Sequence, residues 1–233
     1  MKTRQRTSWT FLVTIGLLAS IGCNDSSNDI LNSSNDIEYV AIGASDAAGI
    51  GAEPLTDGYV YLISDRLDTI TEGVSLRNLG IPGAESKQFL DVEVPVATEL
   101  KPELITIWAG PNDIVGGVSS SDFNSTVDKM LSELTQKTSA FIVIATIPQL
   151  TKLPRFVEKP DVDVTEERIS EYNVIIRALA AKYNVTIADL SRFQPTDTLV
   201  SDTDGFHPSN EGHKLLASIF LEVIEPVFTN TKK

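Results

Sequence analysis

Short apolar runs alternate with longer amphipathic stretches along the chain from residue 39 onwards. The short runs are typical of buried strands, and stretches with apolar residues three or four positions apart are typical of helices. The predicted strands are residues 39–43, 74–79, 103–108, 140–147 and 185–189. The predicted helices are residues 57–70, 84–100, 121–137, 164–183 and 208–225.

This alternation predicts right-handed βαβ units, in which five parallel strands form one sheet that helices cover on both faces. The predicted fold class is therefore α/β, with three layers. The helix that begins near residue 121 has Ser121 as its expected N-cap and Asp122 in its first turn. Functional sites in such sheets lie beyond the carboxyl ends of the strands, so we expect functional residues directly after strands.

The first 22 residues follow a different pattern. Lys2, Arg4 and Arg6 precede an uncharged, mostly apolar run at 9–22, which is shorter than the roughly 20 residues that a membrane-spanning helix needs. Small residues adjoin Cys23, the only cysteine in the chain. The segment resembles a bacterial lipoprotein signal, with an ordinary signal peptide and a chance cysteine as the alternative.

The lipoprotein resemblance implies that residues 1–22 are removed and that Cys23 is lipidated. It also implies export to the bacterial cell envelope, with a lipid anchor in a membrane facing the periplasm or the outer surface. Residues 24–37 are polar and repeat the pentapeptide Ser-Ser-Asn-Asp-Ile, which is too little apolar surface to fold alone. We interpret residues 23–38 as the lipidated cysteine with a flexible tether, and residues 39–230 as the folded domain.

Length and composition fit one folded domain, because the chain has 233 residues and 42% of them are hydrophobic. The formal net charge is −13, and it becomes −16 without the three basic residues of the N-terminal segment. So acidic a body repels the phosphate backbone, and we expect no nucleic-acid partner. A single cysteine cannot form a disulfide within the chain.

A serine and a histidine follow predicted strands at opposite ends of the domain. Ser45 lies in the glycine-flanked turn after the first strand, which is weak evidence alone because serine and glycine are common in turns. Asp204 and His207 are three residues apart, so one short turn can present both side chains. A histidine can take the proton of a serine hydroxyl, and a carboxylate can orient that histidine. The second histidine, His213, lies on the last predicted helix, and we expect it to be exposed to solvent.

Two further segments after strands can bind negative charge. Gly110-Pro111-Asn112-Asp113 follows the third strand, and the Asn112 amide can donate a hydrogen bond to a developing oxyanion. The glycine-rich segment 78–84 follows the second strand and can supply a backbone N–H at a helix start.

Four segments resemble the motif blocks of the SGNH (GDSL-type) hydrolase superfamily and occur in the same order along the chain. The resemblance extends over about residues 39–225. The matching segments are Gly43-Ala44-Ser45 with Gly49, Gly80-Ile81-Pro82-Gly83, Gly110-Pro111-Asn112-Asp113, and Asp204-Gly205-Phe206-His207 with the following Pro208-Ser209-Asn210-Glu211-Gly212.

The resemblance implies a flavodoxin-like α/β/α sandwich and a catalytic triad of Ser45, Asp204 and His207. It also implies an oxyanion hole built from the N–H groups of Ser45 and Gly83 and from the Asn112 side chain. The reaction it implies is ester hydrolysis through an acyl-enzyme, which requires no metal and no cofactor.

One position departs from the family pattern. Ala44 stands where the family usually has an aspartate, and an aspartate follows the serine instead, at Asp46. The triad does not need the missing aspartate chemically, so the departure concerns the local turn. Ala47 also rules out a Gly-x-Ser-x-Gly element, which argues against the nucleophile elbow of α/β-hydrolases.

The segment 148–163 follows the fourth strand and contains Leu150, Leu153 and Phe156. These side chains either line a substrate pocket or pack the segment against the domain. Trp108 ends a predicted strand, and we expect it in the core rather than as a substrate platform.

Several functions are open at this point. The leading one is hydrolysis of a small ester or of a lipid or acyl ester, of the esterase, lipase or lysophospholipase type. A carbohydrate O-acetyl esterase would use the same mechanism. A lipoprotein that binds a ligand without turnover is the alternative from another class. The expected partners are the substrate and, through the anchor, a membrane.

Overall fold

The structure is a computed structural model, and it describes residues 36–229. The predicted signal segment 1–22, the lipidation site Cys23 and most of the predicted tether lie outside the described residues. Within residues 36–229, no helix is long and apolar enough to cross a membrane.

Five parallel strands form a single sheet, as the sequence predicts. The strands are β1 (Ile37–Ile42), β2 (Val74–Asn78), β3 (Leu104–Ile107), β4 (Phe141–Ala145) and β5 (Thr186–Ala188). Their order is β2-β1-β3-β4-β5, which is the flavodoxin-like order. β2 is added on one side of β1 and the later strands on the other side, so the order of the strands reverses between β1 and β3. Ile42 of β1 lies beside Ile107 of β3 at this position. The carboxyl ends of these two strands are therefore where a ligand site is expected.

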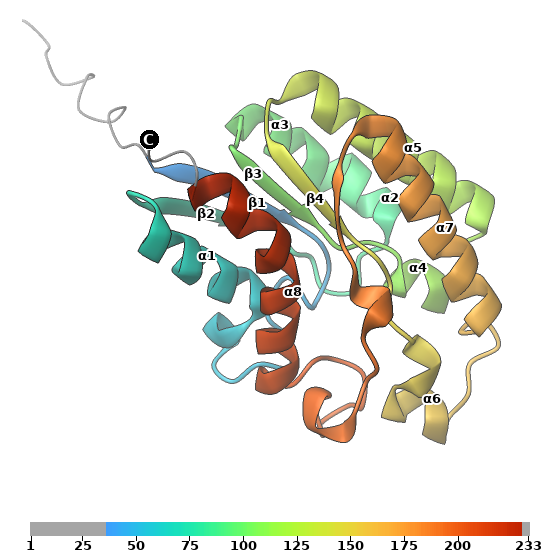
Figure 1. The fold of residues 1–233 in the computed structure, drawn as a ribbon. Helices are drawn as coiled ribbons and strands as arrows, with labels where there is room; N and C mark the ends of the chain where they lie inside the picture. Colours follow the sequence, from blue (N-terminus) through green and yellow to red (C-terminus); the bar gives the residue numbers. More distant parts are fainter. Residues whose placement is uncertain (1–35, 230–233) are drawn as a thin grey trace, which may run out of the picture. The chain divides into compact units, whose positions relative to one another are not determined.

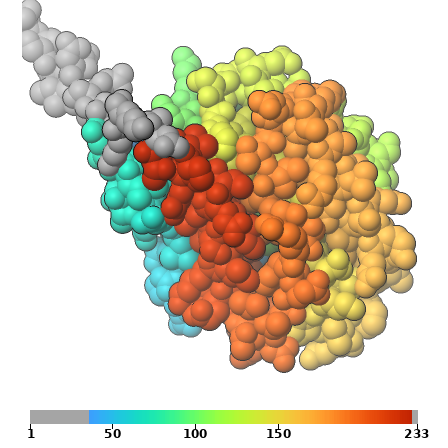
Figure 2. All heavy atoms as spheres, viewed as in Figure 1, coloured from blue at the N-terminus to red at the C-terminus, as the bar shows by residue number. Residues whose placement is uncertain are grey.

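Helices cover both faces of the sheet and complete the predicted three-layer α/β/α fold (Figure 1). One layer holds α1 (Tyr59–Ile70) and α8 (Asn210–Thr229), which pack on each other. The other layer holds α3 (Val94–Leu100), α5 (Ser120–Lys137) and α7 (Glu166–Tyr183). In the space-filling view, α7, α8 and the segment between them cover much of the face that is shown (Figure 2).

Alternating side chains of the strands divide the core into two parts. Val40 and Ile42 of β1 pack with α3, α5 and α7, whereas Tyr39 and Ala41 pack with α1 and α8. Successive side chains of a strand point to opposite faces, so a strand that is covered on both sides must be apolar at nearly every position. All four residues of β3 are buried for this reason.

Short helical segments depart from the predicted pattern. The predicted helix at 84–100 consists of α2 (Ser86–Gln88), a π-helical turn (Phe89–Glu93) and α3. Pro95 lies in the first turn of α3 and has no N–H to continue regular α-helical hydrogen bonding. The segments that the sequence did not predict are α4 (Pro111–Val115), α6 (Pro154–Glu158) and the 3-10 helices Leu55–Asp57, Leu150–Lys152, Leu190–Arg192 and Asp197–Leu199.

The N-cap of α5 is Ser119 and not Ser121. The Ser119 hydroxyl accepts a hydrogen bond from the N–H of Asp122. A cap must lie in extended backbone just before the first helical turn, and Ser119 has that conformation, whereas Ser121 is already inside the helix. The prediction for this cap was therefore wrong by two residues.

Candidate active site

Ser45, His207 and Asp204 lie together at the carboxyl edge of the sheet. Ser45 follows β1 and is 6% exposed. His207 Nε2 lies 2.9 Å from the Ser45 hydroxyl oxygen. On the other side of the ring, His207 Nδ1 is hydrogen-bonded to Asp204 Oδ2. The structure thus joins, in one chain of hydrogen bonds, residues that are 162 positions apart.

The environment of Asp204 favours its charged form. Burial raises the pKa of Asp204, but hydrogen bonds from the His207 side chain and from the N–H groups of Phe206 and His207 outweigh it, so the pKa lies below its usual value. An ionised Asp204 accepts a hydrogen bond from the Nδ1–H group of His207. His207 Nε2 is then left as the acceptor for the Ser45 hydroxyl.

Backbone hydrogen bonds hold the turn that carries Asp204 and His207. The N–H of Ser201 donates to the carbonyl of His207 at 2.8 Å, and the N–H of Gly205 donates to the carbonyl of Ser201 at 2.9 Å. Gly205 has φ 63°, a left-handed conformation that glycine adopts without steric cost. Its carbonyl accepts a hydrogen bond from the N–H of Arg155, which ties the turn to α6.

The turn around Ser45 is packed closely against the segment that follows β2. A Cβ atom at Gly80 would lie 2.7 Å from the Ala48 nitrogen and 2.8 Å from the Ala44 carbonyl oxygen. Only glycine allows this approach. The Asn78 amide donates to the Ala47 carbonyl at 2.6 Å and joins the two segments.

Three N–H donors are available near this turn. No hydrogen bond between described residues uses the N–H of Ser45 or Gly83. Space around Gly83 is open, because a Cβ there would meet nothing within 4 Å. Asn112, on α4, donates one amide hydrogen to the carbonyl of Ala84 at 2.9 Å. An amide carries two hydrogens, so the second remains for a ligand.

Asp113 holds the helix α4, which carries Asn112, in place. It is buried, and both the N–H and the hydroxyl of Ser86 donate to its carboxyl group. Burial raises the pKa of Asp113, and the hydrogen bonds from Ser86 oppose that rise. The contact fixes α4, which carries Asn112, against the start of α2.

The comparison with protein-family models matches residues 41–215 to the GDSL-like lipase/acylhydrolase family. The match covers most of the chain and every segment of the site. The chain belongs to this family. It is accordingly a serine ester hydrolase, as the SGNH resemblance implied. No curated protein sequence matches the chain.

Solved structures of GDSL-type hydrolases share the fold. The lipase/acylhydrolase from Enterococcus faecalis is similar with a TM-score of 0.69 and 23% identity, over 82% of this chain and 96% of that one. The psychrotrophic esterase EstA from Pseudoalteromonas sp. gives 0.65 and 16%, over 82% and 98%. An acetyl xylan esterase from Geobacillus stearothermophilus gives 0.64 and 19%, over 80% and 93%.

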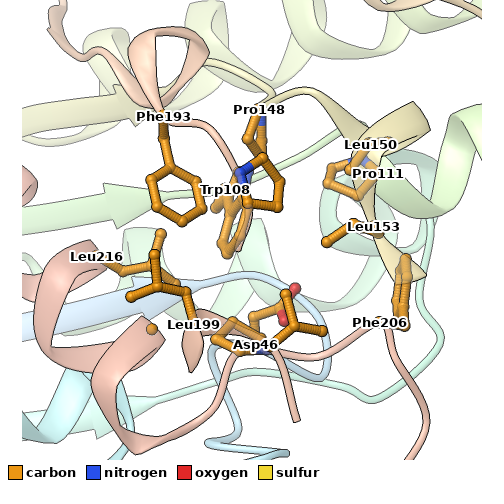
Figure 3. A pocket seen from close by; sticks show the side chains of 14 residues that line it. Asp46, Trp108, Pro111, Pro148, Leu150, Leu153, Phe193, Leu199, Phe206 and Leu216 are labelled. Atoms are coloured by element: carbon orange, nitrogen blue, oxygen red, sulfur yellow. The ribbon is translucent and has the colours of Figure 1, made fainter. Parts of the chain in front are cut away.

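An apolar pocket opens beside the candidate active site (Figure 3). Its lining includes the chain neighbours of three site residues, since Asp46 follows Ser45, Pro208 follows His207 and Pro111 precedes Asn112. The residues that line it come from the segments after β1, β3 and β4, from the segment between β5 and α8, and from the first two turns of α8. They are Asp46, Trp108, Pro111, Pro148, Leu150, Leu153, Phe193, Pro195, Leu199, Val200, Phe206, Pro208, Gly212 and Leu216.

The structure places the three predicted pocket residues differently. Leu150 and Leu153 line the pocket and are also buried, so they both pack their segment and face the site. Phe156 is buried but does not line the pocket, and its ring packs edge-on against Phe206 with centroids 5.9 Å apart. Trp108 is buried, as expected, and also contributes to the pocket wall.

His213 is not a surface residue, and the prediction of its exposure was wrong. It is 0% exposed. Its Nδ1 accepts a hydrogen bond from the N–H of Tyr59 at 3.2 Å, and its Nε2 lies 3.0 Å from the carbonyl oxygen of Ile50. Burial lowers the pKa of His213, so the ring is neutral at pH 7 and links α8 to α1 and to the segment after Ser45.

Sequence reasoning missed Glu93, which lies on the π-helical turn and is 1% exposed. Its Oε2 accepts a hydrogen bond from the N–H of Gly43 at 2.9 Å, two residues before Ser45. Within residues 36–229, neither Glu93 Oε1 nor the buried Tyr59 hydroxyl has a hydrogen-bond partner. Burial raises the pKa of Glu93 to about 8. The segment Phe89–Val94 contains two acidic residues, Asp91 and Glu93, among apolar ones, so the sequence alone does not single out Glu93.

Proposed function

We propose that the chain hydrolyses carboxylic esters, with Ser45 as nucleophile, His207 as general base and acid, and Asp204 as the group that orients His207. One observation carries the proposal: His207 bridges the Ser45 hydroxyl, at 2.9 Å from Nε2, and the Asp204 carboxylate at Nδ1. A serine hydroxyl becomes an effective nucleophile when a histidine in this position takes its proton.

The reaction proceeds in two halves. The Ser45 oxygen attacks the ester carbonyl carbon while His207 Nε2 takes the hydroxyl proton, and the carbonyl oxygen becomes an oxyanion. The N–H groups of Ser45 and Gly83 and the free amide hydrogen of Asn112 stabilise that charge. The intermediate then releases the alcohol, which receives the proton from His207, and an acyl-enzyme remains. Water, activated by His207, hydrolyses the acyl-enzyme and restores Ser45.

The substrate class follows from the pocket beside Ser45. Its walls are almost entirely apolar, and its cavity volume is about 40 Å³. Such walls suit the hydrocarbon part of a ligand. We therefore assign the pocket to the acyl chain of an ester, which favours a small ester or a lipid or acyl ester.

A carbohydrate O-acetyl ester is the second candidate substrate. A polar hollow lies next to the triad, and Arg155, Glu158, Asp202, Thr203 and Asp204 are among the residues that line it. Hydroxyl-rich sugars are bound by such side chains through hydrogen bonds. The acetyl xylan esterase from Geobacillus stearothermophilus has a similar fold.

The test is a hydrolysis panel of p-nitrophenyl esters from acetate to dodecanoate, with lysophospholipids and acetylated xylan. Wild type is compared with Ser45→Ala and with Ser121→Ala, which alters an exposed serine on α5. We expect turnover of at least one ester class by wild type and Ser121→Ala, and a loss of about 10⁴-fold or more in Ser45→Ala. Turnover that survives in Ser45→Ala contradicts the mechanism. A folded wild type without activity on any ester favours a ligand-binding protein instead.

A further inference from the structure

Asp46 is the only ionisable side chain among the residues that line the apolar pocket. It directly follows Ser45, and Figure 3 shows its carboxyl group pointing into the pocket. The backbone N–H of Asp46 itself donates to this carboxyl group, and the residue is partly exposed. A carboxyl group in an apolar wall with one backbone donor gains from a further hydrogen bond that a ligand supplies.

The charges around Asp46 are unusual for an acyl pocket. Burial raises the pKa of Asp46 to about 6, with the charge of His207 lowering it and that of Asp204 raising it. The carboxyl group is thus ionised above pH 7, and no basic side chain lines the pocket. A saturated alkyl chain in this pocket would displace water from the carboxylate without replacing the hydrogen bonds of that water.

Resting on the proposed esterase function, we infer that Asp46 selects esters whose acyl chain carries a hydroxyl group, which donates a hydrogen bond to the Asp46 carboxylate. The apolar walls bind the carbon chain, and the carboxylate binds its hydroxyl group. The substrate class is therefore a hydroxyacyl ester.

An ammonium group fits the same pocket less well. A hydroxyl has one hydrogen to donate and an ammonium has three. The only acceptor side chain in the pocket wall is the Asp46 carboxylate, so further N–H groups of an ammonium would face carbon atoms. A site built to bind a substrate hydroxyl strongly rejects the analogue that lacks it, because its own polar group is left unpaired.

The experiment measures kcat/KM at pH 8, where Asp46 is ionised, for p-nitrophenyl hexanoate and for its 3-hydroxy and 6-hydroxy derivatives. The matching methoxy esters are the control, because a methoxy group has nearly the same position and electronic effect but cannot donate a hydrogen bond. We expect at least one hydroxy ester to exceed both its methoxy analogue and hexanoate by about tenfold or more.

In Asp46→Leu, that preference should fall to about onefold, whereas Asp46→Asn, which keeps a hydrogen-bonding group of the same shape, should retain part of it. Equal preferences in wild type and Asp46→Leu would overturn the inference, as would a stronger preference for 6-aminohexanoate. Hydrolysis of all esters with no preference refutes only the role of Asp46. If no ester is hydrolysed and a fluorophosphonate probe does not react with Ser45, the proposed function itself is refuted.

Discussion

At the scale of single residues, the site combines acids whose protonation states differ because their partners differ. Asp204 is held charged by the N–H groups that point at it, and its pKa lies below the usual value. Glu93 is buried with one N–H donor, and its pKa is raised to about 8. At pH 7 the first is a carboxylate that orients His207, and the second is a neutral acid that holds the backbone before Ser45.

Glu93 makes the stability of the domain depend on pH. Its pKa is higher in the folded state than the ordinary value of 4.5. Its contribution to stability is therefore complete below pH 4.5 and is lost as the pH rises through about 8. Glu93→Gln keeps the acceptor for the Gly43 N–H and does not titrate. We expect the difference in free energy of unfolding, Glu93→Gln minus wild type, to increase by on the order of 3–4 kcal/mol between pH 5 and pH 9.

Urea unfolding of both proteins at pH 5 and pH 9 measures this difference. Glu133→Gln, on the surface of α5, is the control that removes a carboxylate outside the core. If wild type and Glu93→Gln lose stability in parallel over this range, Glu93 is not buried as a neutral acid.

At the scale of elements, the site depends on how closely the turn after β1 meets the segment after β2. Gly80→Ala tests this contact, because a Cβ there would overlap backbone atoms of Ala44 and Ala48. We expect a loss of about 1–3 kcal/mol in stability and a fall in kcat of at least tenfold, since Ser45 lies in the displaced turn.

The control for this prediction is Gly73→Ala, which lies before β2 at the opposite edge of the sheet. A Cβ there would lie 2.2 Å from Asp36 Oδ1, and the φ of 157° disfavours a side chain, so this substitution also strains the backbone, but at the edge of the sheet opposite Ser45. We expect Gly73→Ala to keep wild-type kcat. Equal kcat values in Gly80→Ala and wild type would show that the close contact does not position Ser45.

The same elements explain what the sequence could predict. The strand centres and the order of the four motif blocks were predictable, because buried parallel strands are continuous apolar runs and their carboxyl ends meet at one edge. The burial of His213 was also encoded, since it shares one face of α8 with Leu216, Phe220 and Ile224. Helical periodicity places these positions together, but a histidine at the end of such a series is easily taken for a surface residue.

Other features depended on contacts that no local pattern contains. The role of Glu93 requires the π-helical turn to bring its carboxyl group to Gly43, and these residues are 50 positions apart. The pocket wall combines segments from four parts of the chain, so Leu150 and Leu153 could be proposed from sequence but Phe193 and Leu199 could not. The position of Asp46 in that wall likewise becomes visible only when the strands are assembled.

At the scale of the whole molecule, we propose that Cys23 anchors the hydrolase domain to a membrane of the bacterial envelope. In a bacterial host fed with an alkyne-labelled fatty acid, we expect wild type to carry the label and to remain with the membranes. Cys23→Ser should lose the label and become soluble, because a lipid chain supplies the binding energy through its buried CH₂ groups. Label that persists in Cys23→Ser, or a soluble and unlabelled wild type, contradicts the anchor.

Ser45 is the proposed nucleophile, and the mass of the protein after reaction with a fluorophosphonate tests this role without the need for a known substrate. We expect one adduct per chain, located on the peptide that contains Ser45, and no adduct in Ser45→Ala. An adduct on another serine with Ser45 unmodified, or an unreacted wild type that is folded, would contradict this role.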